Sequence, residues 1–141
     1  MGIDECKRKG FVKKTRIDPE LAKSLSEMSD IKEKAIKNVN LDAENISAFV
    51  PMAYDSLREV LEAICIMHGY KVTSHVCIDK LLSTIYPDIS WQDFDRFRYI
   101  RNGINYYGKK IDFEQGKEII DKIFLLKKDV ALLLDDLLDR A

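Results

Sequence analysis

The chain has 141 residues, of which 46% are hydrophobic and 33% are charged, and its formal net charge is −1. This composition is typical of a soluble globular protein and excludes a disordered chain, and the length suffices for one domain with its own core. No apolar run reaches the length of a membrane span, and the first ten residues lack the apolar stretch of a secretory signal. The three cysteines (Cys6, Cys65 and Cys77) lack metal-ligand spacing. We therefore expect a cytoplasmic protein with reduced thiols and no cofactor.

Positive charge is concentrated at the N-terminus. Residues 1–16 contain six basic and two acidic side chains, whereas the remainder is acidic overall. We expect this segment to be a flexible arm, which either keeps the protein soluble or touches phosphates. Residues 17–141 are expected to form a single domain.

Helical periodicity governs the first half of that domain. Asp18 followed by Pro19 is a typical helix start and predicts a helix over residues 19–38. The next apolar stripe is wide, so residues 42–68 should form a helix that is central to the core. Because proline removes a backbone donor and clashes with the preceding turn, we expect a kink or a break at or just before Pro51.

Three more helices are predicted over residues 74–86, over residues 90–110, and from Asp112 to near the C-terminus. No strand-like alternation of any length separates them. The sequence therefore predicts an all-α fold, an antiparallel bundle of about five helices with short connections.

The second and fifth of these helices are each about 40 Å long, at 1.5 Å per residue. Helices of that length expose more apolar side chain than a small bundle covers. A homodimer would bury this surface. Alternatively, the helix over residues 19–38 covers it within one chain.

The fourth helix carries polar residues in an apolar stripe. Phe94, Phe97 and Ile104 follow helical spacing, and Arg101 and Asn105 share their face. Such an arginine either serves a function or is structural, in which case it snorkels to the edge of the bundle or pairs with a carboxylate. Three acidic residues on one side of the 42–68 helix are candidate partners: Asp55, Glu59 and Glu62.

Metal and nucleophile motifs are absent. The two histidines, His68 and His75, are seven residues apart across a glycine turn, which is not the spacing of a helical metal pair. His75 opens a helix directly after Ser74, where it either fixes the turn as a neutral imidazole or lies beside a phosphate held by Lys71 and Ser74.

The segment Arg101–Tyr106, RNGINY, resembles a known signature: Arg-Asn, three residues and His, placed late in a helix before a final long helix. This is the signature of the HEPN superfamily of small helical bundles. The turn Gly69–Lys71, with the Ser-His pair that follows it, resembles the turn between the second and third helices of archaeal and bacterial members. The resemblance covers most of residues 42–138.

The resemblance implies a homodimer in which the Arg and His of both chains meet in an interface cleft. Many members are metal-independent endoribonucleases, often toxins that are paired with a small nucleotidyltransferase-like antitoxin. In these the His performs acid/base chemistry at the ribose 2′-hydroxyl, and the Arg stabilises charge on the phosphate. Other members have lost the chemistry and serve as binding or scaffolding modules.

The sequence departs from the signature at its last position, where Tyr106 replaces the His. Tyrosine ionises near pH 10 and histidine near pH 6.5, so a phenol is a poor general base at neutral pH. We therefore expect Arg101, Asn102 and Tyr106 to bind RNA or a nucleotide, with weak or absent cleavage. Further ligand contacts are expected from Lys71, Ser74, His75, Asn105 and Tyr107.

Two alternatives remain open. In the first, Tyr106 or His75 takes over the acid/base role, and the protein is an active ribonuclease. In the second, the protein is a non-catalytic scaffold, and Arg101 holds a dimer together through a carboxylate of the partner chain.

Overall fold

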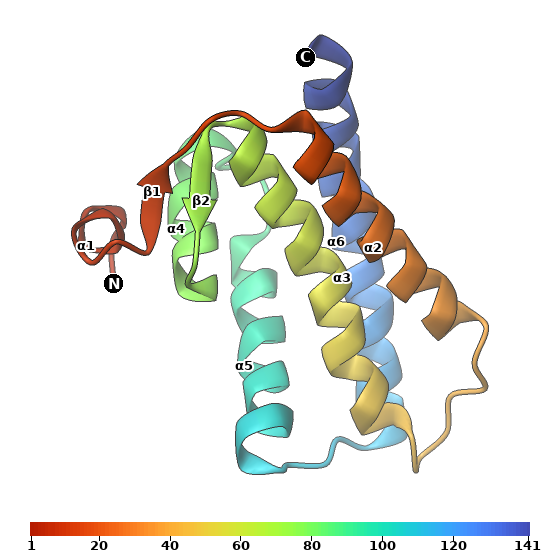
Figure 1. Ribbon diagram of the computed structural model, residues 1–141. Coiled ribbons are helices and arrows are strands. Elements are labelled where there is room, and N and C mark those ends of the chain that lie inside the picture. Colours follow the sequence, from red (N-terminus) through yellow and green to blue (C-terminus); the bar gives the residue numbers. More distant parts are fainter.

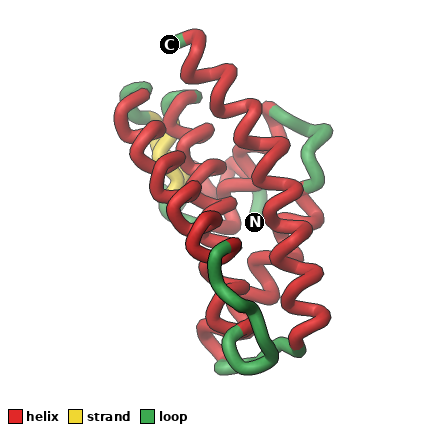
Figure 2. The backbone as a smooth tube through the Cα atoms, turned by 90° about the vertical axis from the view of Figure 1, so that its right-hand side faces the viewer, coloured by secondary structure: helices red, strands yellow, loops and turns green.

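The computed structural model describes residues 1–141 as six helices and one two-stranded sheet (Figure 1). The predicted helical bundle is confirmed, because the five expected helices correspond to α2 through α6. Figure 2 shows that the sheet is a small ribbon on an otherwise helical chain. In chain order the elements are α1 (Ile3–Arg8), β1 (Val12–Lys14), α2 (Pro19–Lys37), α3 (Ile46–Met67), β2 (Tyr70–Val72), α4 (His75–Ile85), α5 (Trp91–Tyr107) and α6 (Phe113–Arg140).

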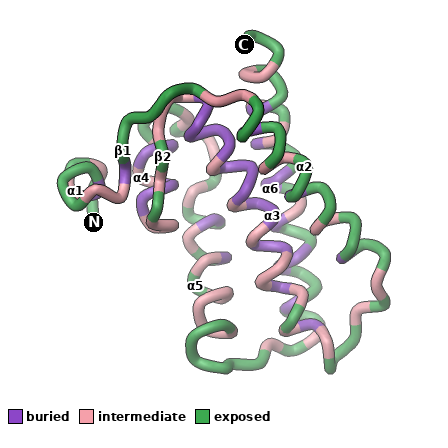
Figure 3. Tube along the Cα trace, in the orientation of Figure 1, coloured by how far each residue is buried: buried purple, intermediate pink, exposed green.

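Helix α3 is the centre of the molecule, as its wide apolar stripe predicts. It packs against α2 and α6 along its length and contacts α4, α5 and β2 as well (Figure 1). Of its 22 residues, 14 are buried, which leaves little of the helix facing solvent (Figure 3). The hydrophobic core is therefore built around this one helix.

The start of α3 differs from the prediction. Asp42 folds back in a turn, with its carboxylate accepting the backbone N–H groups of Glu44 and Asn45, so the helix begins at Ile46. The chain stays helical through Pro51, and the expected break is absent. Pro51 lies in the second turn of the shortened helix. The hydrogen bond that proline removes would join it to the first turn, so the rest of the helix is not interrupted.

The N-terminal segment, for which we expected a flexible arm, contains a short helix and a strand. Residues 3–8 form α1, and β1 pairs with β2 in an antiparallel ribbon. Cys6 and Cys77 are joined by a disulfide, and Val12 is buried. The expectation of reduced thiols is therefore wrong for these two residues, whereas Cys65 is free and buried. An all-α reading missed the ribbon because each strand is only three residues long.

Helix α2 packs along α3 and reaches α6 through charged side chains. Lys127 of α6 is 3% exposed and forms ion pairs with Asp30 (2.9 Å) and Glu33 (2.6 Å) of α2. Leu125 and Leu132 remain exposed on α6, so the homodimer stays a prediction. None of the helices combines the length and the apolar character needed to cross a bilayer.

We predict that reduction of the Cys6–Cys77 disulfide lowers the free energy of unfolding by about 2–5 kcal/mol. The bond closes a loop across 71 positions, and opening it increases the conformational freedom of the unfolded chain. Guanidinium unfolding with and without dithiothreitol measures the effect. The Cys6→Ala/Cys77→Ala variant should not respond to dithiothreitol, and an unchanged wild-type midpoint would show that the bond contributes nothing.

Candidate functional site

The C-terminal half of α5 leaves the core. Only Phe94 and Phe97 of this helix are buried, and every residue from Arg98 to Tyr107 is half-buried or exposed (Figure 3). Gly108 ends the helix in the left-handed region, at φ 62°, where a side chain would be strained. The segment that carries Arg101 thus lies at the surface and is anchored through the buried side chains of Phe94 and Phe97.

Arg101 is the polar centre of this segment. Its Nη1 donates to the Asn102 side-chain oxygen at 3.1 Å and to the Tyr106 hydroxyl at 3.2 Å. The guanidinium carbon lies 5.6 Å from the ring centre of Tyr54 and 5.5 Å from that of Tyr106, within cation–π range. Its Nε is buried and donates no hydrogen bond.

His75 reaches this cluster through Tyr54. The Tyr54 hydroxyl lies 3.3 Å from Nδ1 of His75, and the Tyr54 ring stacks on Phe94 with centres 5.6 Å apart. Burial raises the pKa of the Tyr54 phenol, so the phenol keeps its proton and can donate it to the Nδ1 lone pair. Burial lowers the pKa of His75 to about 4, with nearby Arg58 and Arg101 adding to the effect. The imidazole is therefore neutral at pH 7.

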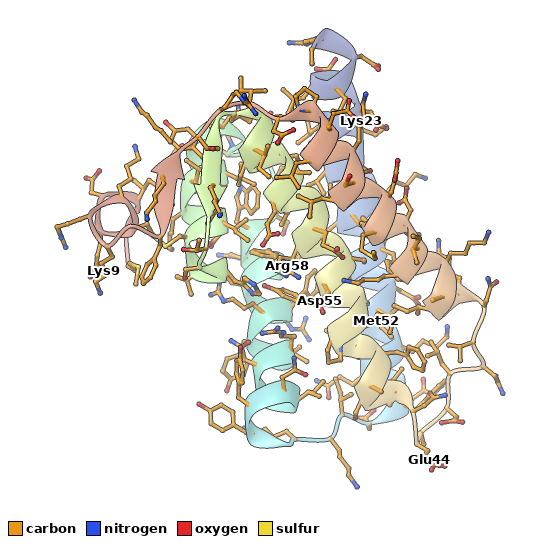
Figure 4. The ribbon with its side chains drawn as sticks, viewed as in Figure 1. Lys9, Lys23, Glu44, Met52, Asp55 and Arg58 are labelled. Carbon is orange, nitrogen blue, oxygen red and sulfur yellow. A yellow bond between two sulfur atoms is a disulfide. The ribbon has the colours of Figure 1, made fainter.

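The three carboxylates considered as partners of Arg101 have other partners in the chain. Asp55 and Glu62 form ion pairs with Arg58, at 3.7 and 2.7 Å, and Figure 4 shows Asp55 and Arg58 on the side of α3 nearest α5. Glu59 pairs with Lys32 of α2 at 2.8 Å. Arg101 forms no ion pair, because two of these acids pair with Arg58 of their own helix and the third pairs with Lys32 of α2.

A second charged cluster, which the sequence did not reveal, lies between α4 and α5. Arg98 pairs with Asp95 at 2.9 Å and lies 3.8 Å from Asp79, which is 3% exposed. Burial, followed by a hydrogen bond with Asp95, raises the pKa of the Asp79 carboxyl. One sequence signal was available, since Asp79 falls among Cys77, Ile78 and Leu81 on the buried face of its helix. This cluster helps to fix α5 against α4.

A groove of about 370 Å³ runs beside the end of α5. Three exposed tyrosines line it (Tyr99, Tyr106 and Tyr107), and their exposed fractions are 67–76%. Lys109 and Lys110 contribute positive charge at its rim. Exposed aromatic faces next to cations are the surfaces on which nucleic-acid bases and phosphates bind.

The structure brings together some of the predicted site residues and separates others. Arg101, Asn102, Tyr106 and His75 belong to one cluster, together with Tyr54, which lies in the apolar stripe of its helix. Tyr107 lines the groove, and Asn105 is exposed. Lys71 lies on β2 and lines a different groove, and the Ser74 side chain does not cap α4. A phosphate site formed by these last two at the start of α4 gains no support.

Comparison with family models, with curated proteins and with solved structures found no match. The HEPN resemblance therefore stays a prediction from the residues Arg101–Tyr106 and the order of the helices. Three or more His, Cys, Asp or Glu side chains do not gather anywhere in the arrangement that a metal ion requires.

We predict that His75 makes stability fall as the pH drops. Its pKa is lowered from 6.5 to about 4, so between these values the unfolded state binds the proton more readily than the folded state does. The stability that the neutral His75 contributes is fully present above pH 6.5 and is lost as the pH falls toward 4. Asp79, with its raised pKa, acts in the opposite direction over the acid range.

The measurement is therefore a difference between thermal unfolding of the wild type and of His75→Asn from pH 4 to pH 7. Asparagine keeps an acceptor near the Tyr54 hydroxyl but does not titrate. The difference in melting temperature between the two proteins should change across this pH range. A constant difference would contradict the buried, neutral imidazole.

Proposed function

We propose that this chain is a HEPN-like helical protein that binds RNA or a nucleotide as a homodimer, with Arg101 at the centre of the site and Asn102 and Tyr106 beside it. One observation carries the proposal: the Arg101 guanidinium is half-buried without any carboxylate to balance its charge. The other interior cations of this region, Arg58 and Arg98, each pair with acids. An uncompensated, partly desolvated cation is a favourable place for an anion.

The geometry suits a phosphate. A guanidinium presents a planar set of donors to phosphate oxygens, and the contacts to Asn102 and Tyr106 involve only Nη1, which leaves Nη2 to donate to a phosphate oxygen. Because the Tyr106 hydroxyl accepts a hydrogen bond from Arg101, its own proton is free to be donated to a phosphate oxygen. The exposed tyrosines of the adjoining groove offer faces on which a base can stack.

A metal-independent ribonuclease is the second candidate, and the Tyr54–His75 contact favours it. This contact connects an imidazole on α4 with the ring on which Arg101 lies. The neutral imidazole has a nitrogen lone pair for proton transfer, which a neutral phenol does not offer, but its lowered pKa makes it a weaker base than a free histidine. An antitoxin related to nucleotidyltransferases would be the expected partner in that case.

Metal-free incubation with RNA separates the two candidates. Cleavage by the wild type that is lost in His75→Asn or Tyr106→Phe supports the ribonuclease. Cleavage that survives both substitutions excludes these residues as the acid/base groups. A protein that binds RNA without cutting it fits the leading proposal.

The scaffold reading finds less support. It requires Arg101 to pair with Asp55, Glu59 or Glu62 of a second copy, and each of these acids already has a cation partner in its own chain. An intersubunit pair would have to replace one of those contacts.

We predict that Arg101→Ala weakens the binding of a fluorescein-labelled RNA oligonucleotide by roughly 10- to 100-fold, the effect of losing hydrogen bonds to a charged group. Fluorescence anisotropy measures the affinity. Arg96→Ala is the matched control, because Arg96 is an exposed arginine of the same helix outside the cluster. Equal affinities for the two variants would refute the proposed site.

A further inference from the structure

The β1–β2 ribbon places two lysines directly opposite each other. In its antiparallel register Lys13 pairs with Lys71, between the pairs Val12–Val72 and Lys14–Tyr70. Side chains opposite each other in such a pair point to the same face, about 5 Å apart at Cβ. Because Val12 is buried and lies on the other face, the two lysines face outward, and both are exposed. Like charges in this position destabilise a ribbon.

The chain does not neutralise this charge. Lys7, Lys13, Lys14, Arg16 and Lys71 form no ion pairs, and in the N-terminal segment only Lys9 does, with Glu5. The lysines of α2 show that the protein can arrange such pairs. Three of them have acidic partners within 4 Å, namely Lys23, Lys32 and Lys37. The ribbon is therefore a concentrated positive surface on a chain whose net charge is −1.

The ribbon is also held in place. The Cys6–Cys77 disulfide fixes the segment before β1 to α4, and backbone hydrogen bonds extend the pairing at both ends, from Thr15 to Gly69 and from Thr73 to Phe11. A flexible basic arm would lose conformational entropy on binding. Cations on a fixed support avoid most of that cost, so they are suited to hold a ligand of defined shape.

A groove of about 570 Å³ adjoins the ribbon, and Arg16 and Lys71 line it. Neither of its two acids forms an ion pair with these cations. The Asp18 carboxylate caps α2 by accepting the Leu21 N–H, and Glu62 pairs with Arg58. The cations of the groove are thus available to an external anion.

We infer that the β1–β2 ribbon binds the phosphate backbone of a single-stranded RNA, at a surface separate from the Arg101 site. This inference rests on the proposed function and extends it, because it makes the ligand an RNA chain rather than a single nucleotide. Exposed lysines on a ribbon carry no base-reading groups, so the surface contributes affinity and position without sequence preference.

The test compares Lys13→Ala/Lys71→Ala with Lys117→Ala/Lys128→Ala, whose two exposed lysines lie on α6 and form no ion pair. The probes are a fluorescein-labelled oligouridylate of roughly 12 nucleotides and uridine 5′-monophosphate. Each lost phosphate contact should flatten the slope of log affinity against log salt by about 0.7. For the oligouridylate, the slope of log affinity against log salt should therefore be shallower by about 1.4 in the ribbon variant than in the wild type. The variant should bind the monophosphate as the wild type does.

The outcomes separate this inference from the proposed function. If the ribbon variant keeps the wild-type salt slope while Arg101→Ala no longer binds either probe, the inference is overturned and the proposed function stands. If the ribbon variant loses slope while Arg101→Ala binds both probes normally, the ribbon site stands and the proposed function fails. A loss of slope in the α6 control equal to that of the ribbon variant also overturns the inference, because the binding would then reflect general positive charge.

Lys13→Glu offers a readout that a structural role would not produce. It replaces a repulsive cross-strand pair with an attractive one, so the variant should melt no lower than the wild type. The same change should weaken oligouridylate binding. Tighter or unchanged binding by a folded Lys13→Glu variant would contradict the inference.

Discussion

The ring of Tyr54 connects the hydrophobic core of this protein to its polar site. It projects from α3, is fully buried, and stacks on Phe94 of α5, while its hydroxyl meets His75 at the start of α4. Arg101 lies over the same ring. Since α5 buries only two side chains, this stacking and the Arg98 cluster together set where its exposed half lies. The position of Arg101, and with it the proposed site, depends on how Tyr54 packs.

Local chemistry in the sequence was sufficient to predict most of the helical frame. The Asp18 and Asp112 side chains cap α2 and α6 by accepting the N–H groups of Leu21 and Gln115. Aspartate is favoured at helix starts because it forms this hydrogen bond. The wide apolar stripe identified α3 as central because a helix that is apolar on most sides has to be buried. The polar cluster was indicated by Arg101, which interrupts the apolar stripe of α5. A cation in such a stripe does not help packing, so it is expected mainly at a functional or strained site.

Contacts between distant segments could not be predicted in this way. The ribbon joins residues 12–14 to 70–72, and its three-residue strands are too short for an alternating pattern to show. The disulfide depends on the same fold, which brings Cys6 against α4. Helical spacing likewise indicates the acidic side of α3, but it does not show that Lys32 of another helix pairs with Glu59. The role of Tyr54 was hidden because an aromatic residue in an apolar stripe is typical of a core position.

The most direct test of the Arg101 site is an NMR titration of the arginine side-chain Nε–H resonances with uridine 5′-monophosphate, with the Arg101 signal assigned by its loss in Arg101→Lys. Arg101 has no carboxylate partner within the chain, so a phosphate that binds the end of its guanidinium should perturb its Nε–H resonance saturably. Arg58 and Arg98 already pair with acids and should shift little. A saturable shift at another arginine with Arg101 unchanged would contradict the proposed site.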